Sequence, residues 1–224
     1  MSFKLFKISF YIILITLILL FYTKDINLFG TKFYKNIKNV KNPNSLDTLV
    51  NKNHRLDKFY KPNDLVLLDT RYSNENKFLR EEAKINFEKL SSDASKLGYK
   101  IIATSTYRSY FYQNELYNYY VKSKGMEYAD RCSARPGHSE HQTGLAVDVM
   151  GSNEDYDEFE LSIEFNWMIN NAHNYGFILR YPKGKEHITG FKYEPWHYRY
   201  VGKDIATFIY ENKLTLEEYK KTKK

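Results

Sequence analysis

The spacing of apolar residues predicts helices and strands that alternate over most of the chain. Between residues 78 and 98 the apolar side chains recur every three or four positions, as in an amphipathic helix, and the segment ends in glycine, a common C-cap. These side chains belong to Phe78, Leu79, Ala83, Phe87, Leu90, Ala94 and Leu97. Segments 109–125, 162–177 and 204–214 have helical patterns as well.

Short runs of β-branched and small residues between these helices predict strands at 99–107, 144–151 and 177–181. Residues 65–68 fit a short strand or an extended segment, and 182–190 fit a hairpin-like loop. The connections are too short and irregular for repeated βαβ units. We therefore expect an α+β fold, a single domain with a mostly antiparallel sheet flanked by helices.

The amino terminus carries an uncharged apolar run, Ile8 to Tyr22, which follows Lys4 and Lys7. This pattern predicts a transmembrane anchor whose first seven residues stay in the cytoplasm. Signal-peptide cleavage requires small residues, and the first alanine of the chain is Ala83, so an uncleaved anchor is favoured. A cleaved signal peptide remains the alternative. Either way the rest of the protein is expected outside the cytoplasmic membrane.

Composition divides the remainder into three parts. Residues 23–48 are rich in Lys and Asn and are interpreted as a linker, 49–214 as the folded domain, and 215–224 as a basic, solvated tail. A net charge of +7 is compatible with nucleic acid, an anionic membrane surface or an anionic wall polymer. The apolar anchor argues against a nucleic-acid partner. The single cysteine, Cys132, forms no internal disulfide and is interpreted as an incidental thiol.

The segment "SEHQTGLAVD" ends in an aspartate, Asp148, that lies inside a predicted buried strand. A buried carboxylate is costly unless a positive group pairs with it, and the flanking residues of the strand include no Lys or Arg. A metal ion is one way to pair it. His141 supplies a second ligand, so a third ligand must come from elsewhere in the chain.

Among the six histidines, His197 alone sits beside a carboxylate in a rigid context, the segment "EPWH". Pro195 excludes a helix interior, so this segment is a stiff turn or strand end that presents His197 and Glu194 to one cavity. Glu194 is then the base that deprotonates a metal-bound water. His138 is an alternative ligand, but its position beside a glycine favours an exposed side chain.

These two motifs, in this order, resemble those of the VanY-type zinc D-alanyl-D-alanine carboxypeptidases, which share a fold with the Hedgehog zinc domain. The segments "YRSYFYQNELY" (107–117) and "ARPGHSEHQTG" (134–144) also resemble that family. The resemblance extends over about residues 49–214. It implies one Zn²⁺ held by His141, Asp148 and His197, with Glu194 as the general base.

The resemblance also implies residues for the substrate. Arg108 is expected to stabilise the oxyanion or to bind the substrate carboxylate, and Gln113 and Ser139 to help hold that carboxylate. The implied reaction is removal of the terminal D-alanine from peptidoglycan stem peptides. Two alternatives stay open: an L,D-carboxypeptidase of the same fold that acts on tetrapeptide stems, and a non-catalytic, zinc-containing wall-binding domain.

Overall fold

The computed structural model describes residues 33–152, 155–156 and 158–223. The fold discussed below belongs to the compact unit Ile37–Lys224. The predicted anchor at residues 8–22 lies outside the described residues. Within the part that is described, every helix is too short or too polar to cross a membrane.

A four-stranded sheet forms the centre of this unit, with the strand order β5-β6-β8-β7. All three pairings are antiparallel. The strands are β5 (Ile102–Ser105), β6 (Ala146–Met150), β7 (Phe177–Leu179) and β8 (His197–Tyr200). Each predicted strand at 99–107, 144–151 and 177–181 therefore contains an observed one, and the expected α+β class with a mostly antiparallel sheet is confirmed.

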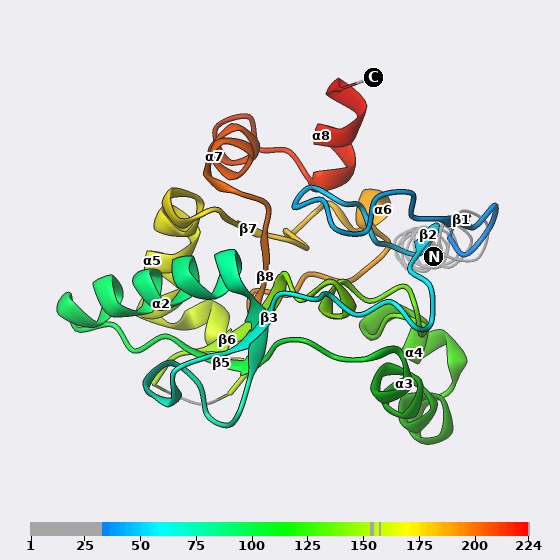
Figure 1. Cartoon of the computed structure of the whole chain (residues 1–224), viewed down its shortest axis with the longest axis horizontal. Coiled ribbons are helices and arrows are strands. Elements are labelled where there is room, and N and C mark those ends of the chain that lie inside the picture. The colour runs from blue at the N-terminus through cyan, green and yellow to red at the C-terminus, as the bar shows by residue number, and fades with distance from the viewer. Residues whose placement is uncertain (1–32, 153–154, 157, 224) are drawn as a thin grey trace, which may run out of the picture. The chain divides into compact units, whose positions relative to one another are not determined.

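Two smaller sheets accompany the central one. Strand β3 (Leu65–Leu67) pairs antiparallel with β4 (Phe78–Arg80), whereas β1 (Lys38–Asn39) pairs parallel with β2 (His54–Arg55). The α-helices that the structure describes are α2 (Glu81–Lys96), α3 (Tyr110–Lys124), α4 (Met126–Cys132), α5 (Ile163–Asn171), α6 (Glu186–Thr189), α7 (Lys203–Glu211) and α8 (Leu216–Thr222). Figure 1 shows α2 and α5 together at the left and α3 and α4 at the lower right, with the central strands between them.

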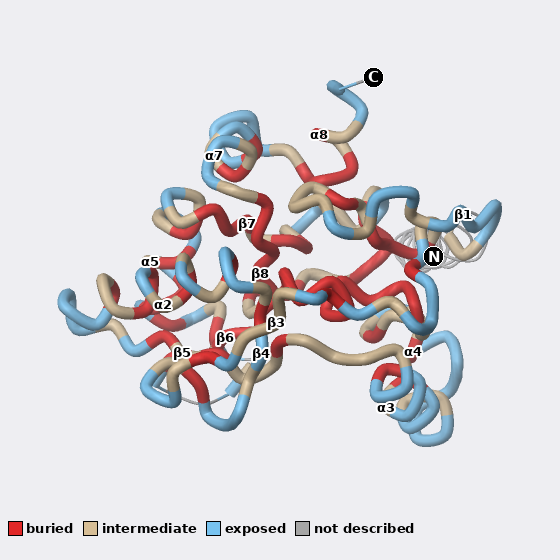
Figure 2. The backbone as a smooth tube through the Cα atoms, in the orientation of Figure 1, coloured by how far each residue is buried: buried red, intermediate tan, exposed pale blue. Residues whose placement is uncertain are grey.

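The two faces of the central sheet differ in chemistry. Because side chains alternate along a strand, Val147 and Val149 of β6 and Tyr198 and Tyr200 of β8 point into the main apolar core. The same core contains buried residues of α2 and α5, including Phe87. The intervening positions on the opposite face are largely polar. Buried backbone follows the three strands β6, β7 and β8 in Figure 2.

The structure corrects two predicted elements. Phe78 and Leu79 do not begin the first long helix, because they lie in β4 and pair with Leu67 and Val66 of β3. The helical spacing of their side chains is therefore overridden by strand pairing, and α2 starts at Glu81. The predicted hairpin-like loop at 182–190 contains the short helix α6 instead.

The predicted borders of the domain also change. The segment assigned to a basic tail contains α8, whose Leu216 and Tyr219 are buried in a second apolar cluster with residues of β7 and α7. The segment assigned to a linker contains β1, and its Thr48 is buried. Composition therefore placed both borders too far inside the domain, and in the carboxy-terminal segment the buried Leu216 and Tyr219 directly precede the lysines.

Candidate active site

Strand register places two of the predicted ligands side by side. Asp148 of β6 is the direct partner of His197 of β8, and both side chains lie on the sheet face opposite the apolar core. The His197 Nδ1 atom is 2.8 Å from Asp148 Oδ1. Two distant parts of the chain thus meet through a single cross-strand pair.

The third predicted ligand, His141, reaches this pair from the 3₁₀ turn Glu140–Thr143 that precedes β6. Gly144 ends that turn with φ +67°, and a Cβ there would lie 2.7 Å from a Leu65 side-chain carbon, so the turn requires glycine. The His141 Nδ1 atom is 2.6 Å from the Thr106 carbonyl oxygen. This contact fixes the ring, and Nε2 faces Asp148 Oδ2 at 3.3 Å.

These three side chains have the geometry and chemistry of a metal site. One ligand atom from each of His141, Asp148 and His197 can be chosen so that all three lie within 4.8 Å of one another. All three residues are buried, and His141 Nε2 has no hydrogen-bond partner in the described part of the chain. Two imidazoles and one carboxylate form the three-ligand set that catalytic zinc takes. The residues therefore fit a zinc ion.

The electrostatics of the three groups depend on their close approach. Burial by itself would raise the pKa of Asp148, but the two histidines lower it well below its usual value. Burial, with the nearby Arg108 charge, lowers the pKa of His141 to about 4. Burial would also lower the pKa of His197, but Asp148 and Glu140 raise it to about 9. A divalent ion at this position competes with protons for both imidazoles.

Glu194 lies at the same cavity, in the turn that leads into β8. One of its carboxylate oxygens, Oε2, is 3.9 Å from His197 Nδ1, and the side chain is buried. Burial, helped by the negative charge of Asp148 and opposed by His197, raises the pKa of Glu194 to about 7. A carboxyl group with this pKa can both accept and donate a proton near neutral pH.

Arg108 lies across the cavity, which has a volume of about 280 Å³. Its Nη2 atom is 3.9 Å from Asp148 Oδ2, and its buried Nε has no hydrogen-bond partner among the described residues. The backbone N–H of Arg108 donates to the His141 carbonyl, which ties it to the ligand turn. The guanidinium therefore retains donors for an anion in the cavity.

Gln113 and Ser139 also line this cavity, and both are buried. Gln113 Nε2 donates to Ser133 Oγ at 3.1 Å and to the Ala134 carbonyl at 2.8 Å. An amide carries two N–H donors, so both are used within the protein. In this orientation Gln113 holds the 133–134 loop and has no N–H left for a carboxylate.

The other histidines lie away from the three ligands. His138 is buried rather than exposed, and its Nδ1 is 2.8 Å from the Asn51 carbonyl oxygen, so the predicted exposure was wrong. His173 stacks on Tyr210 with ring centroids 3.8 Å apart. Trp196 lines the cavity, as expected of a residue next to a ligand.

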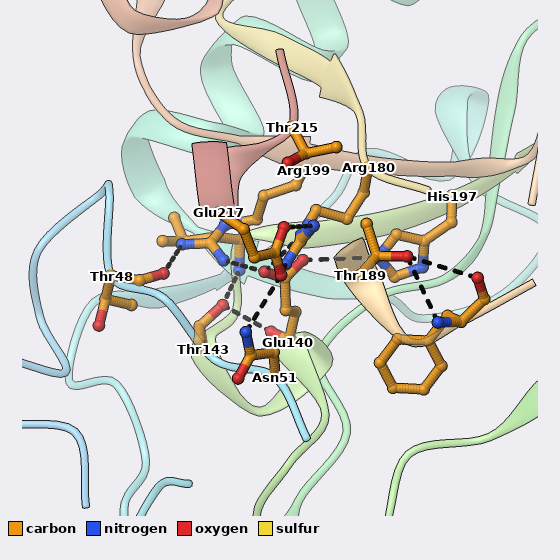
Figure 3. Close-up of polar contacts among 12 residues, drawn as sticks. Thr48, Asn51, Glu140, Thr143, Arg180, Thr189, His197, Arg199, Thr215 and Glu217 are labelled. Atoms are coloured by element: carbon orange, nitrogen blue, oxygen red, sulfur yellow. Dashed lines mark hydrogen bonds and ion pairs between the residues drawn. The ribbon is translucent and has the colours of Figure 1, made fainter. Parts of the chain in front are cut away.

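Sequence reasoning missed a group of buried charges behind His197. Arg180, Arg199 and Glu217 surround Glu140, whose carboxylate lies beside the His197 ring (Figure 3). Glu140 directly precedes the predicted ligand His141 in the sequence, and this position was the only local indication that Glu140 belongs to the site. Its partners Arg180 and Arg199 are 40 and 59 residues away in sequence, so no local pattern could reveal them.

A three-ligand metal site with a buried carboxylate and an arginine at one cavity defines a metal-dependent hydrolase. The family model of VanY, D-alanyl-D-alanine carboxypeptidase, matches residues 76–203. The chain belongs to this family. The predicted membership, made from two short motifs, is confirmed, as is the prediction of an enzyme of the carboxypeptidase type.

Three relatives place the chain within the family. The bifunctional D-Ala-D-Ala dipeptidase and carboxypeptidase VanXYC of Enterococcus gallinarum is 42% identical over 176 residues, covering 76% of this chain and 91% of the relative. The structure of the L,D-carboxypeptidase LdcB has a TM-score of 0.78 and 42% identity, covering 84% of this chain and 91% of LdcB. A D,D-pentapeptidase VanY variant from a VanB-type cassette, solved with Zn(II), has a TM-score of 0.64 and 33% identity, covering 76% of this chain and 96% of that one.

Proposed function

We propose that this protein is a zinc-dependent carboxypeptidase that removes the C-terminal D-alanine from peptidoglycan stem peptides. The observation that carries the proposal is the convergence of His141, Asp148 and His197 with Glu194 at one cavity. The register of β6 with β8, which pairs Asp148 with His197, supports this arrangement. The Zn(II)-bound VanY relative supports the choice of metal.

Each residue of the cavity then has a specific task. When bound, zinc polarises the scissile carbonyl and acidifies a water molecule. Glu194 accepts the proton of that water and later delivers it to the leaving amine, for which a pKa of about 7 is suited. Asp148 and the two histidines, with their rings held by neighbouring groups, provide the ligands.

Arg108 and Ser139 form the substrate side of the proposal. The unpartnered Arg108 Nε and the outer guanidinium nitrogens offer N–H groups to the oxyanion or to the terminal carboxylate. Ser139 lines the same cavity and offers a hydroxyl to that carboxylate. Gln113 supports this wall through Ser133 and Ala134, and contacts substrate directly if its amide gives up one of those donations.

The first choice of substrate is the pentapeptide stem that ends in D-Ala-D-Ala, and VanXYC supports it. The second is the tetrapeptide stem of an L,D-carboxypeptidase, which the 42% identity to LdcB supports. Both reactions release D-alanine from the same metal site. Incubation of the zinc-loaded full chain with defined pentapeptide and tetrapeptide muropeptides, followed by mass spectrometry, separates them. Release of D-alanine from neither stem contradicts the proposed function.

We also propose that residues 8–22 anchor the enzyme in the cytoplasmic membrane, with the catalytic domain outside. The uncharged apolar run after Lys4 and Lys7 supports this topology. Fractionation of cells that express the full chain, with protease added to intact protoplasts, tests it. Full-length protein in the membrane fraction, digested from outside, is the expected result. Full-length protein in the soluble fraction contradicts it.

A further inference from the structure

Next to the three ligands lies a second buried group, which we name the arginine–glutamate cluster: Glu140, Arg180, Arg199 and Glu217. Arg180 and Arg199 are both 0% exposed. Glu140 Oε1 accepts from Arg180 Nε and from Arg199 Nη1, each at 2.8 Å. Arg180 also donates to both oxygens of Glu217, at 2.7 and 2.9 Å. Two positive and two negative charges therefore cancel inside the protein (Figure 3).

One atom of this cluster is left without a partner. Glu140 Oε2 is buried and accepts no hydrogen bond from any described residue. The nearest nitrogen given for it is His197 Nε2, at 3.7 Å, and that nitrogen is likewise buried and unpartnered. This separation exceeds an N–H···O bond of about 2.9 Å by less than about 1 Å. Two buried polar atoms that lack partners thus face each other.

The cluster holds the Glu140 carboxylate rigidly. Arg199 is itself fixed by donations from Nη2 to the Leu46 and Thr48 carbonyls, both at 2.9 Å. Arg199 and His197 lie on the same face of β8, and Arg180 follows β7 directly. With Oε1 bound to both guanidinium groups, the second oxygen cannot turn away from the His197 ring without breaking charge-assisted hydrogen bonds.

We propose that Glu140 is a positioning residue for the metal site: its Oε2 keeps the proton of His197 on Nε2, so that Nδ1 presents its lone pair to the metal. A neutral imidazole carries its proton on one nitrogen, and a carboxylate facing that nitrogen fixes both the tautomer and the ring orientation. His197 Nδ1 already lies beside Asp148. This inference rests on the proposed function only in so far as it assumes a metal at the three ligands.

Glu217 offers a matched control for Glu140. Each is a buried glutamate bonded to Arg180, but the atoms of Glu217 contact Arg180 and Asn51 and none of the contacts given for it involves His197. In Glu217→Gln, Arg199 and Arg180 still hold Glu140. The variants Glu140→Gln and Glu217→Gln therefore remove the same charge from the same cluster, and they differ in whether the charge faces a metal ligand.

The test is the zinc affinity of the full chain, measured by competition with a chromophoric chelator, for wild type and both variants. We expect Glu140→Gln to weaken zinc binding about 10- to 100-fold. We expect Glu217→Gln to bind zinc within about threefold of wild type, although both variants lower the melting temperature of the apo protein. Unchanged affinity in Glu140→Gln overturns the proposal. An equal loss in the two variants also overturns it, because that result is the signature of a purely structural cluster.

A measurement on wild type keeps the proposal testable if Glu140→Gln does not fold. In the ¹⁵N-labelled, zinc-loaded protein, the His197 ring should show a metal-bound Nδ1 and a protonated, slowly exchanging Nε2. A metal-bound Nε2 overturns the proposal. Wild type that binds zinc but releases no D-alanine refutes the proposed function and leaves this test readable, whereas wild type that binds no zinc overturns both.

Discussion

Two buried polar groups lie side by side in this protein and differ in how completely they are paired. In the active-site group, His141 Nε2 and Arg108 Nε have no hydrogen-bond partner among the described residues. In the arginine–glutamate cluster, both arginines donate to carboxylates or carbonyls, and only the Glu140 oxygen that faces His197 is unpartnered. Buried polar atoms are rarely left unpaired. We therefore expect a ligand to bind at the active-site group, and the arginine–glutamate cluster to hold the active-site side chains in position.

The same comparison explains why charge is buried in both places. A buried ion pair seldom adds net stability, because desolvation offsets the attraction. The apolar face of the sheet, with Phe87 against Phe177, is what stabilises the fold. The charged groups on the opposite face instead hold the side chains of the active site in position. Removing one of them should therefore change activity or site geometry more than removing an apolar core side chain would.

The largest effect on activity is expected from Glu194→Gln. The amide keeps the shape of the side chain but cannot accept a proton, so kcat should fall about 10²- to 10⁴-fold. Zinc content should stay at the wild-type level, because Glu194 is not one of the three ligands. Steady-state kinetics on a stem peptide, together with metal analysis of the same sample, checks both statements. A variant with wild-type kcat would remove Glu194 from the mechanism.

The next effect falls on stability and concerns the apolar face. Phe87 is fully buried against Phe177, so Phe87→Ala should lower the free energy of unfolding by about 3–5 kcal/mol. Chemical denaturation of the apo protein measures it. Below the melting transition, zinc affinity and kcat should match wild type. A large loss of zinc affinity in the folded variant would show that the two faces of the sheet are not independent.

Arg108→Ala tests the donor side of the active-site group. Loss of a positioned guanidinium should lower kcat/KM about 10²- to 10³-fold. Arg108→Lys should recover only part of it, since an ammonium lacks the planar fork. The control is Arg71→Ala, because Arg71 is exposed and the contacts given for it are with its sequence neighbours Asp69 and Tyr72. Equal activity of Arg108→Ala and the control would assign Arg108 to packing.

The smallest effect is expected at the surface pair that ties α8 to residue 47. Lys220 Nζ is 2.7 Å from Asp47 Oδ2, and both side chains are partly exposed. Lys220→Ala should cost at most about 1 kcal/mol of unfolding free energy, and less at high salt. Denaturation at two salt concentrations measures it. A loss of several kcal/mol would mean that this pair, rather than the buried Leu216 and Tyr219, holds the helix.

The sequence was informative where a motif is local. A buried aspartate without a nearby cation identified Asp148 as a group that needs a partner, and Pro195, two residues before His197, correctly excluded a helix. Both arguments use residues within a few positions of one another. The strand β6 and the start of α5, close to the beginning of the predicted helix at 162–177, could be predicted for the same reason.

The rest depended on contacts that are distant in the chain. Leu79 has helical spacing but joins β4 because β3 pairs with it. The lysines after residue 215 conceal the three-residue spacing of Leu216 and Tyr219, so the composition predicts a tail where the structure has α8. In the sequence Glu140 looks like one more polar residue, because its partners are distant in the chain: Arg180 follows β7 and Arg199 lies in β8. Long-range pairing leaves no periodic trace in a single sequence.

Zinc stoichiometry tests the central claim most directly. The full chain is stripped of metal, incubated with zinc, passed over a desalting column and analysed for bound metal, alongside Asp148→Asn. The account predicts one zinc per wild-type chain, and for Asp148→Asn a loss of bound zinc with retained circular dichroism. A wild-type protein that retains no zinc, or an Asp148→Asn variant that retains one zinc with wild-type affinity, would contradict it.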